Sequence, residues 1–126
     1  MNYSVTFLGE VAELRCFKTF TFKDGLAALT EVIDAPWRPR MRSLLILDEG
    51  SQFSPTRDGI GKLKDLMDTI LSSDEVKIAV VIAEVVHFGI GRAIEDRVDP
   101  GGERVRVFLR EEAAREWLSA AASPAV

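Results

Sequence analysis

Acidic side chains follow two apolar segments of this sequence that are typical of buried strands. Asp48 and Glu49 come directly after the apolar run 44–47, and Glu84 follows the apolar run 78–83. If both runs are parallel strands, their carboxyl ends meet at one edge of a sheet, where open α/β folds usually bind ligands. Carboxylates gathered there could hold a cation or polarise a substrate. Solvated loop acids and helix caps are commoner, so an enzyme using these carboxylates is the weakest functional hypothesis.

Apolar side chains are concentrated near the same acidic positions. Phe53 follows the first acidic pair, and Val85, Val86 and Phe88 follow the second apolar run, with His87 among them. Because loops rarely carry so many apolar side chains, this edge is a candidate surface for a protein partner or for a small apolar ligand. The alternative is that these side chains close the core. A loop histidine such as His87 more often has no functional role, although its imidazole could titrate near neutral pH.

The remaining nucleophiles and metal ligands do not form a catalytic pattern. Cys16 is the only cysteine and His87 the only histidine, which supports neither a zinc site nor a catalytic triad. Cys16 alternates with Leu14 in an apolar pattern, so we expect a buried and inert thiol. Gly89 and Gly91 form half of a dinucleotide-binding motif. Such a pair of glycines more often permits close backbone packing than it binds phosphate. No cofactor, metal or catalytic residue is predicted.

The composition is that of one ordinary globular domain. The chain has 126 residues, of which 47% are hydrophobic and 29% charged, and its formal net charge is −4. This charge favours neither nucleic acid nor an anionic membrane as a partner. The arginines of segment 38–42 are expected in a solvated loop rather than in a phosphate- or RNA-binding patch. A single cysteine, no visible signal peptide and no apolar run long enough to span a bilayer predict a cytoplasmic protein.

Alternating segments and helical periodicities must position these groups. Residues 3–7 and 12–16 alternate between apolar and polar and flank Gly9, which predicts an opening β-hairpin with a positive φ at that glycine. Thr21 and Asp24 have the spacing of a capping box at the start of a helix. Further strands are expected at 44–47, 76–83 and 105–109, and helices between Thr21 and Pro36, after Ser54 and Pro55, over 88–97 and over 111–122.

The resulting order, ββαβαβαβα, predicts an α/β fold with a mixed, mostly parallel sheet and helices packed on it. One domain is expected over residues 1–126, with residues from about 119 to 126 forming a frayed tail.

Local sequences near the carboxyl terminus resemble those of a bacterial superfamily. Segment 105–110, with Trp117 and Leu118 beyond it, is similar to the last strand and helix of the SpoIIAA-like (STAS-like) superfamily, in its uncharacterised SpoIIAA-like branch. Segment 88–95 resembles the penultimate helix of that branch. The resemblance covers nearly the whole chain and implies the fold that STAS domains share, which is often compared with a lipid-binding module.

The same resemblance implies a candidate site of phosphorylation. STAS antagonists carry an Asp-Ser-(Ser/Thr)-Gly motif where the second helix begins, and a partner kinase phosphorylates its hydroxyl. Segment 53–59 lacks this motif, but Ser54 and Thr56 lie near the corresponding place and are the candidate phosphoacceptors.

The preferred hypothesis is therefore a non-enzymatic protein-interaction or regulatory domain. The alternative is a carrier of a small apolar or lipid-like ligand bound among the apolar residues of the predicted edge. A homodimer is a further hypothesis, because an exposed edge strand of the opening hairpin can pair with its own copy.

Overall fold

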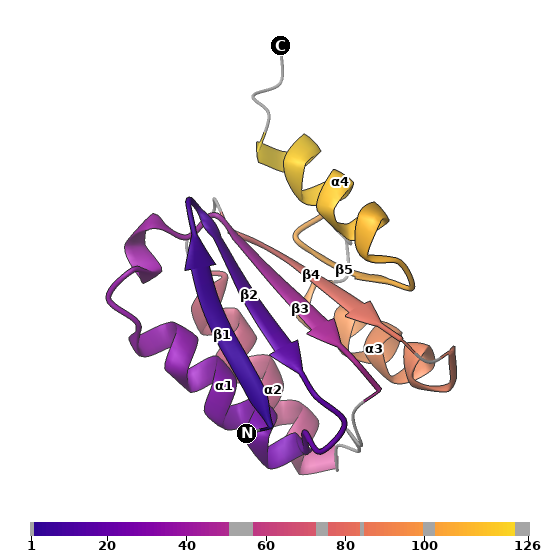
Figure 1. The fold of residues 1–126 in the computed structure, drawn as a ribbon. Helices are drawn as coiled ribbons and strands as arrows, with labels where there is room; N and C mark the ends of the chain where they lie inside the picture. The colour runs from indigo at the N-terminus through magenta and orange to yellow at the C-terminus, as the bar shows by residue number, and fades with distance from the viewer. Residues whose placement is uncertain (1, 51–56, 73–75, 84, 100–102, 123–126) are drawn as a thin grey trace.

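The computed structural model of this chain describes residues 2–50, 57–72, 76–83, 85–99 and 103–122. Within them, five strands form one sheet, and helices connect the strands (Figure 1). The strands are β1 (Tyr3–Leu8), β2 (Val11–Cys16), β3 (Ser43–Asp48), β4 (Lys77–Ile82) and β5 (Val105–Phe108). The helices are α1 (Phe22–Asp34), the short 3-10 helix η1 (Arg38–Arg40), α2 (Arg57–Ile70), α3 (Val85–Val98) and α4 (Glu111–Ala122). The predicted order of strands and α-helices is confirmed.

The strands lie side by side in the order in which they occur along the chain. β1 is antiparallel to β2, and β2 to β5 are parallel to one another. Gly9 has a φ of 67° in the connection between β1 and β2, as the predicted hairpin requires. Each later pair of strands is joined by a helix, because a parallel connection must cross back over the sheet. The predicted mixed, mostly parallel sheet is confirmed.

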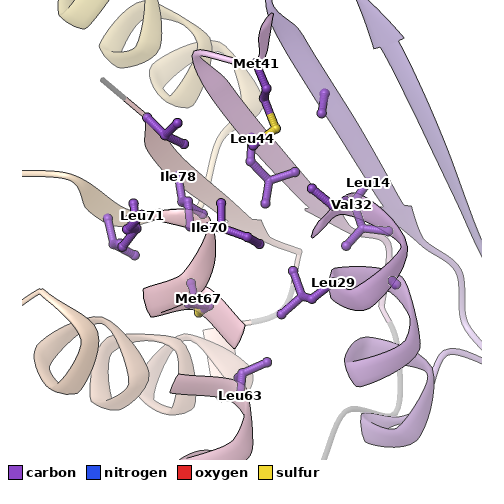
Figure 2. Close-up of a cluster of buried hydrophobic side chains, with 14 of the residues drawn as sticks. Leu14, Leu29, Val32, Met41, Leu44, Leu63, Met67, Ile70, Leu71 and Ile78 are labelled. Carbon is purple, nitrogen blue, oxygen red and sulfur yellow. The ribbon is translucent and has the colours of Figure 1, made fainter. Parts of the chain in front are cut away.

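Two hydrophobic cores lie on opposite faces of the sheet. The larger core joins the sheet to α1 and α2 and contains the fully buried Leu14, Val32 and Leu44 (Figure 2). The smaller core lies beneath α4, which Figure 1 shows on the other side of the sheet, and contains Leu45 and Leu118. α3 packs against β5 and α2. The central strands therefore need continuous apolar sequences, since neighbouring residues enter different cores.

The capping box predicted for α1 is present. The Asp24 N–H donates to Thr21 Oγ1 at 3.4 Å, and the Thr21 N–H donates to Asp24 Oδ2 at 2.9 Å. Asn2 Nδ2 donates to the same carboxylate at 3.0 Å, so the start of β1 is tied to the start of α1. The helix ends at Asp34, before Pro36, as expected.

Several element boundaries differ from the sequence-based expectations. The segment predicted as a loop around Arg38 contains the 3-10 helix η1, in which the N–H groups of Arg40 and Met41 donate to the carbonyls of Trp37 and Arg38. α4 continues to Ala122, so residues 119–122 form its last turn instead of a frayed tail. β5 ends at Phe108, and Leu109 is exposed. The cap predicted at Ser54 lies outside the described residues.

Candidate functional site

The carboxyl ends of the parallel strands meet at one edge of the sheet, as the sequence predicted. Asp48, the last residue of β3, is in register with Cys16 of β2 on one side and with Ile82 of β4 on the other. The Glu49 N–H donates to the carbonyl of Cys16 at 2.9 Å, which continues the ladder by one residue. Asp48 and Glu49 therefore lie at this edge, which we call the carboxyl edge.

The side chain of Glu49 is engaged in an ion pair at this edge. Arg15 Nη1 lies 3.2 Å from Glu49 Oε1, and Arg15 Nη2 lies 3.8 Å from Glu13 Oε2. Arg115 of α4 reaches Glu13 Oε1 at 2.6 Å and Glu111 Oε2 at 2.8 Å. These two carboxylates raise the pKa of Arg115 through hydrogen bonds. A row of alternating charges therefore runs from the carboxyl edge across the outer face of β2 to α4.

This row of charges is the principal feature of the site that the sequence analysis missed. Strand alternation alone places Glu13 and Arg15 on the same face. Nothing local indicates that Arg115, which lies 102 positions from Glu13, completes the row. Ion pairs this exposed contribute little to stability, so their main consequence is a face that carries charge of both signs.

Cys16 is buried in the larger core, as predicted. Burial raises the pKa of its thiol far above the ordinary value, and the charges of Asp48 and Glu49 raise it further. Since the thiolate is the nucleophilic form, burial and the raised pKa both disfavour reaction of this cysteine in the folded protein.

The predicted meeting of three carboxylates is described only in part. Glu84 lies outside the described residues, so its position relative to Asp48 and Glu49 stays a prediction. Across the described ranges, no group of three or more histidine, cysteine or acidic side chains has an arrangement that could hold a metal ion.

The apolar positions of the predicted edge belong to two different segments. Val85, Val86 and His87 were expected in a loop before a helix beginning at Phe88, but α3 begins at Val85, so the backbone of residues 85–88 forms its first turn, which follows β4 at the carboxyl edge (Figure 1). The β-branched Val85 and Val86 are weak helix formers, and tertiary context overrides such preferences. Phe53, Ser54 and Thr56 lie outside the described residues. Their role at this edge stays a prediction.

A small cleft lies at the opposite edge of the sheet, where the parallel strands begin. Its volume is about 260 Å³, and it is lined by Arg38, Pro39, Met41, Ile70 and Val76. Arg38 Nη2 donates to the Thr69 carbonyl at 2.9 Å, and Nη1 donates to the Ile33 carbonyl at 3.5 Å. The guanidinium thus neutralises the negative ends of α1 and α2. This cleft is not the apolar pocket that the alternative carrier hypothesis requires at the carboxyl edge.

A second arginine of this segment, Arg40, lies over an aromatic ring of β1. The guanidinium of Arg40 lies 5.5 Å from the centre of the Phe7 ring, and Phe7 stacks on Trp37 with ring centres 4.7 Å apart. The basic segment is therefore attached to β1 and to two helix ends, whereas the sequence suggested a solvated loop.

No protein-family model and no curated protein matches this sequence. Solved structures do match it. An anti-sigma-factor antagonist (STAS) domain protein from Planctomyces limnophilus has 17% identity and a TM-score of 0.63, over 96% of this chain and 98% of that one. The anti-sigma factor antagonist SpoIIAA in its unphosphorylated form has 10% identity and a TM-score of 0.62, over 93% of this chain and 97% of that one. The Bacillus cell fate determinant SpoIIAA in the phosphorylated form has 11% identity and a TM-score of 0.60, over 90% of this chain and 97% of that one.

These matches show that the chain has the SpoIIAA-like (STAS-like) fold, as its resemblance implied. Among the described helices, none is both long and apolar enough to cross a membrane.

Proposed function

We propose that this chain is a regulatory protein-interaction domain that binds its protein partner at the carboxyl edge of the sheet. One observation carries the proposal. The chain matches an anti-sigma factor antagonist and a STAS domain protein over 93% and 96% of its length. A bacterial origin and a cytoplasmic location, both expected from the sequence, belong to the same proposal.

The carboxyl edge has the physical properties of a recognition surface. Connections that leave the ends of parallel strands lie outside the sheet, so their sequences can vary without disturbing the fold. Arg15 and Glu49 supply charge of both signs at this edge. In the proposal, Phe53 and Phe88 supply the apolar centre, since interfaces concentrate aromatic side chains within a polar rim.

A phosphorylation switch is a finer part of this proposal. One matching structure is that of SpoIIAA in its phosphorylated form. In the present chain, Ser54 and Thr56 are the two hydroxyl residues within three positions of the start of α2, and we propose that one of them accepts phosphate. A phosphate would add a charge of about −1.5 to −2 to an edge that already contains Asp48 and Glu49. Like-charge repulsion would then weaken binding to an acidic partner surface.

Affinity capture with matched variants tests the location of the binding surface. Glu49→Lys and Phe53→Asp alter the carboxyl edge, whereas Leu8→Asp alters a side chain that is 86% exposed at the opposite end of the hairpin. We expect a partner captured by the wild-type chain to be lost with both carboxyl-edge variants and retained with Leu8→Asp. Circular dichroism verifies that each variant is folded. Equal capture by all variants, or loss with Leu8→Asp alone, would contradict the proposal.

Phosphate-affinity electrophoresis of the chain from its native host tests the switch. We expect a slowly migrating species that disappears when Ser54 and Thr56 are both changed to alanine. Thr6→Ala removes an exposed hydroxyl elsewhere and should leave the species unchanged. A slow species that survives the double change, or the absence of any such species, would refute phosphorylation at these positions.

The carrier hypothesis receives no support from the cleft around Arg38. That cleft lies at the other edge of the sheet from the predicted apolar residues, and its volume of about 260 Å³ is below the roughly 300–1,000 Å³ typical of ligand pockets.

A further inference from the structure

We propose that β1 is a strand-pairing edge at which a second copy of this chain binds antiparallel, so that two sheets join across a two-fold axis. This inference is independent of the proposed function, because it concerns the lateral edge of the sheet and not its carboxyl edge.

The hydrogen-bond pattern of the hairpin determines which backbone groups of β1 point outward. The Phe17 N–H donates to the Asn2 carbonyl at 3.0 Å, and the register pairs Tyr3 with Cys16. In an antiparallel ladder, bonded and non-bonded pairs alternate. The N–H and C=O groups of Tyr3, Val5 and Phe7 therefore point away from β2. Within the described part of the chain, no strand lies beyond β1, and no backbone hydrogen bond to these three residues is found there.

The opposite lateral edge of the sheet is closed. The outward N–H of Val105 donates to Asp99 Oδ2 at 3.0 Å, and that of Val107 donates to Glu95 Oε2 at 2.8 Å. Glu95 is only 5% exposed, so its carboxylate is buried against this strand. Acidic side chains at the end of α3 thus accept hydrogen bonds from the N–H groups of β5 to which another strand would have to bind.

β1 carries none of the usual protections of an exposed edge. Edge strands commonly avoid association with a proline, a charged side chain or a bulge. The sequence of β1, Tyr-Ser-Val-Thr-Phe-Leu, contains neither proline nor charge, and its pairing with β2 is uninterrupted over six positions. The two edges of the sheet therefore differ: in the part of the chain that the structure describes, β1 is open to pairing and β5 is not.

A second copy matches this edge in backbone and side chains. If the two-fold axis passes through Val5, Val5 pairs with its own copy and Tyr3 pairs with Phe7 of the second copy. The outward groups then form about six backbone hydrogen bonds, two for each bonded pair. On one face an aromatic ring lies opposite an aromatic ring, and on the other Ser4 lies opposite Thr6, both favourable cross-strand pairs.

The charges around β1 favour the same arrangement. Arg40 lies over the Phe7 end of the strand. Glu31 and Asp24 lie near the Tyr3 end, where burial, followed by these two charges, raises the pKa of the Tyr3 hydroxyl. Antiparallel pairing about Val5 brings the basic end of one copy beside the acidic end of the other. This self-complementarity identifies a second copy as the occupant.

Sedimentation velocity over about a hundredfold range of concentration tests the proposal. Because the pairing area is small, we expect a monomer–dimer equilibrium with a dissociation constant in roughly the micromolar range. Val5→Pro removes an outward N–H without breaking a bond to β2, so it should weaken the dimer at least about tenfold while the monomer stays folded. A wild-type chain that is monomeric at every concentration would overturn the proposal.

A charge exchange keeps the test decisive even if Val5→Pro does not fold. Arg40→Glu should weaken the dimer, and adding Glu31→Lys in the same chain should restore it. Arg110→Glu makes the same change of charge at an exposed position after β5 and should have no effect. A dimer that is insensitive to Arg40→Glu, or equally sensitive to Arg110→Glu, would overturn pairing at β1.

Discussion

At the scale of single residues, the environment of each group decides whether it can react. Cysteine is the most nucleophilic residue type in the chain, yet Cys16 is only 3% exposed, and the pKa of its thiol is raised by burial and by the charges of Asp48 and Glu49. Such a group contributes to packing and not to chemistry.

We predict that the Cys16 thiol of the native protein reacts very slowly with an aromatic disulfide reagent at pH 8. Only the exposed thiolate attacks the reagent, so the reaction must await an opening of the structure. The same reagent should label the unfolded protein in denaturant at least about a hundredfold faster. Immediate and complete labelling of the native protein would show that Cys16 is accessible and ionised.

A second residue-scale prediction concerns Asp24. Hydrogen bonds from Thr21 and Asn2 to the Asp24 carboxylate lower its pKa from the ordinary value of 3.8, the backbone bond from Thr21 having the largest effect. Because the pKa is lower in the folded state, the carboxylate stabilises the fold above about pH 4, and this stabilisation is lost as the pH falls through the folded pKa.

Asp24→Asn should therefore lower the midpoint of urea unfolding at pH 7 and have a much smaller effect at pH 2. Asp34→Asn, at the other end of α1, is the matched control and should not destabilise the protein, because a negative charge is unfavourable at a helix carboxyl terminus. An effect of Asp24→Asn that is equal at both pH values would contradict the account.

At the scale of elements, two glycines in open surroundings should respond to alanine in opposite ways. Apart from adjoining residues and the backbone of the same helix, no heavy atom lies within 4 Å of an added Cβ at Gly61, within α2, or at Gly9, in the hairpin turn. Gly61→Ala should stabilise the protein by about 0.5–1 kcal/mol, since alanine is the better helix former. Gly9→Ala should destabilise it by about 1 kcal/mol, because the φ of 67° is unfavourable for alanine. Thermal unfolding measures both, and changes of the same sign would contradict this assignment of backbone conformations.

Elements were predictable from the sequence wherever their signals are local. Three predicted features arise from neighbouring residues, and each is confirmed: the hairpin around Gly9, the capping box at Thr21 and Asp24, and the apolar strand β3. The start of α3 was placed too late, because valines and glycines weaken helical periodicity there.

Contacts between distant elements had no such signal. Arg38 donates a hydrogen bond to the end of α2, and the Val107 N–H donates one to the Glu95 carboxylate. Both hydrogen bonds depend on how the helices pack, which no local pattern indicates. The candidate site is a similar case, since parallel strands place Asp48 and Glu49 at the carboxyl edge, whereas Arg15, the ion-pair partner of Glu49, comes from another strand. The predicted site residues at 53, 54, 56 and 84 lie outside the described residues.

At the scale of the whole molecule, three edges of one sheet have different characters. The carboxyl edge carries exposed charges of both signs, and β5 is closed by carboxylates from the end of α3. β1 presents outward backbone groups and no charge. This division allows a partner to bind at the carboxyl edge while β1 joins two copies, so that one dimer would present two partner-binding edges.

The central claim is that the protein partner binds at the carboxyl edge, and hydrogen–deuterium exchange with a captured partner tests it most directly. We predict slower exchange in residues 49–57 and 84–88 when the partner is bound, with unchanged exchange in residues 38–42 at the opposite edge of the sheet. Slower exchange confined to residues 38–42 or to β1, or no change at residues 49–57 and 84–88, would contradict binding at the carboxyl edge.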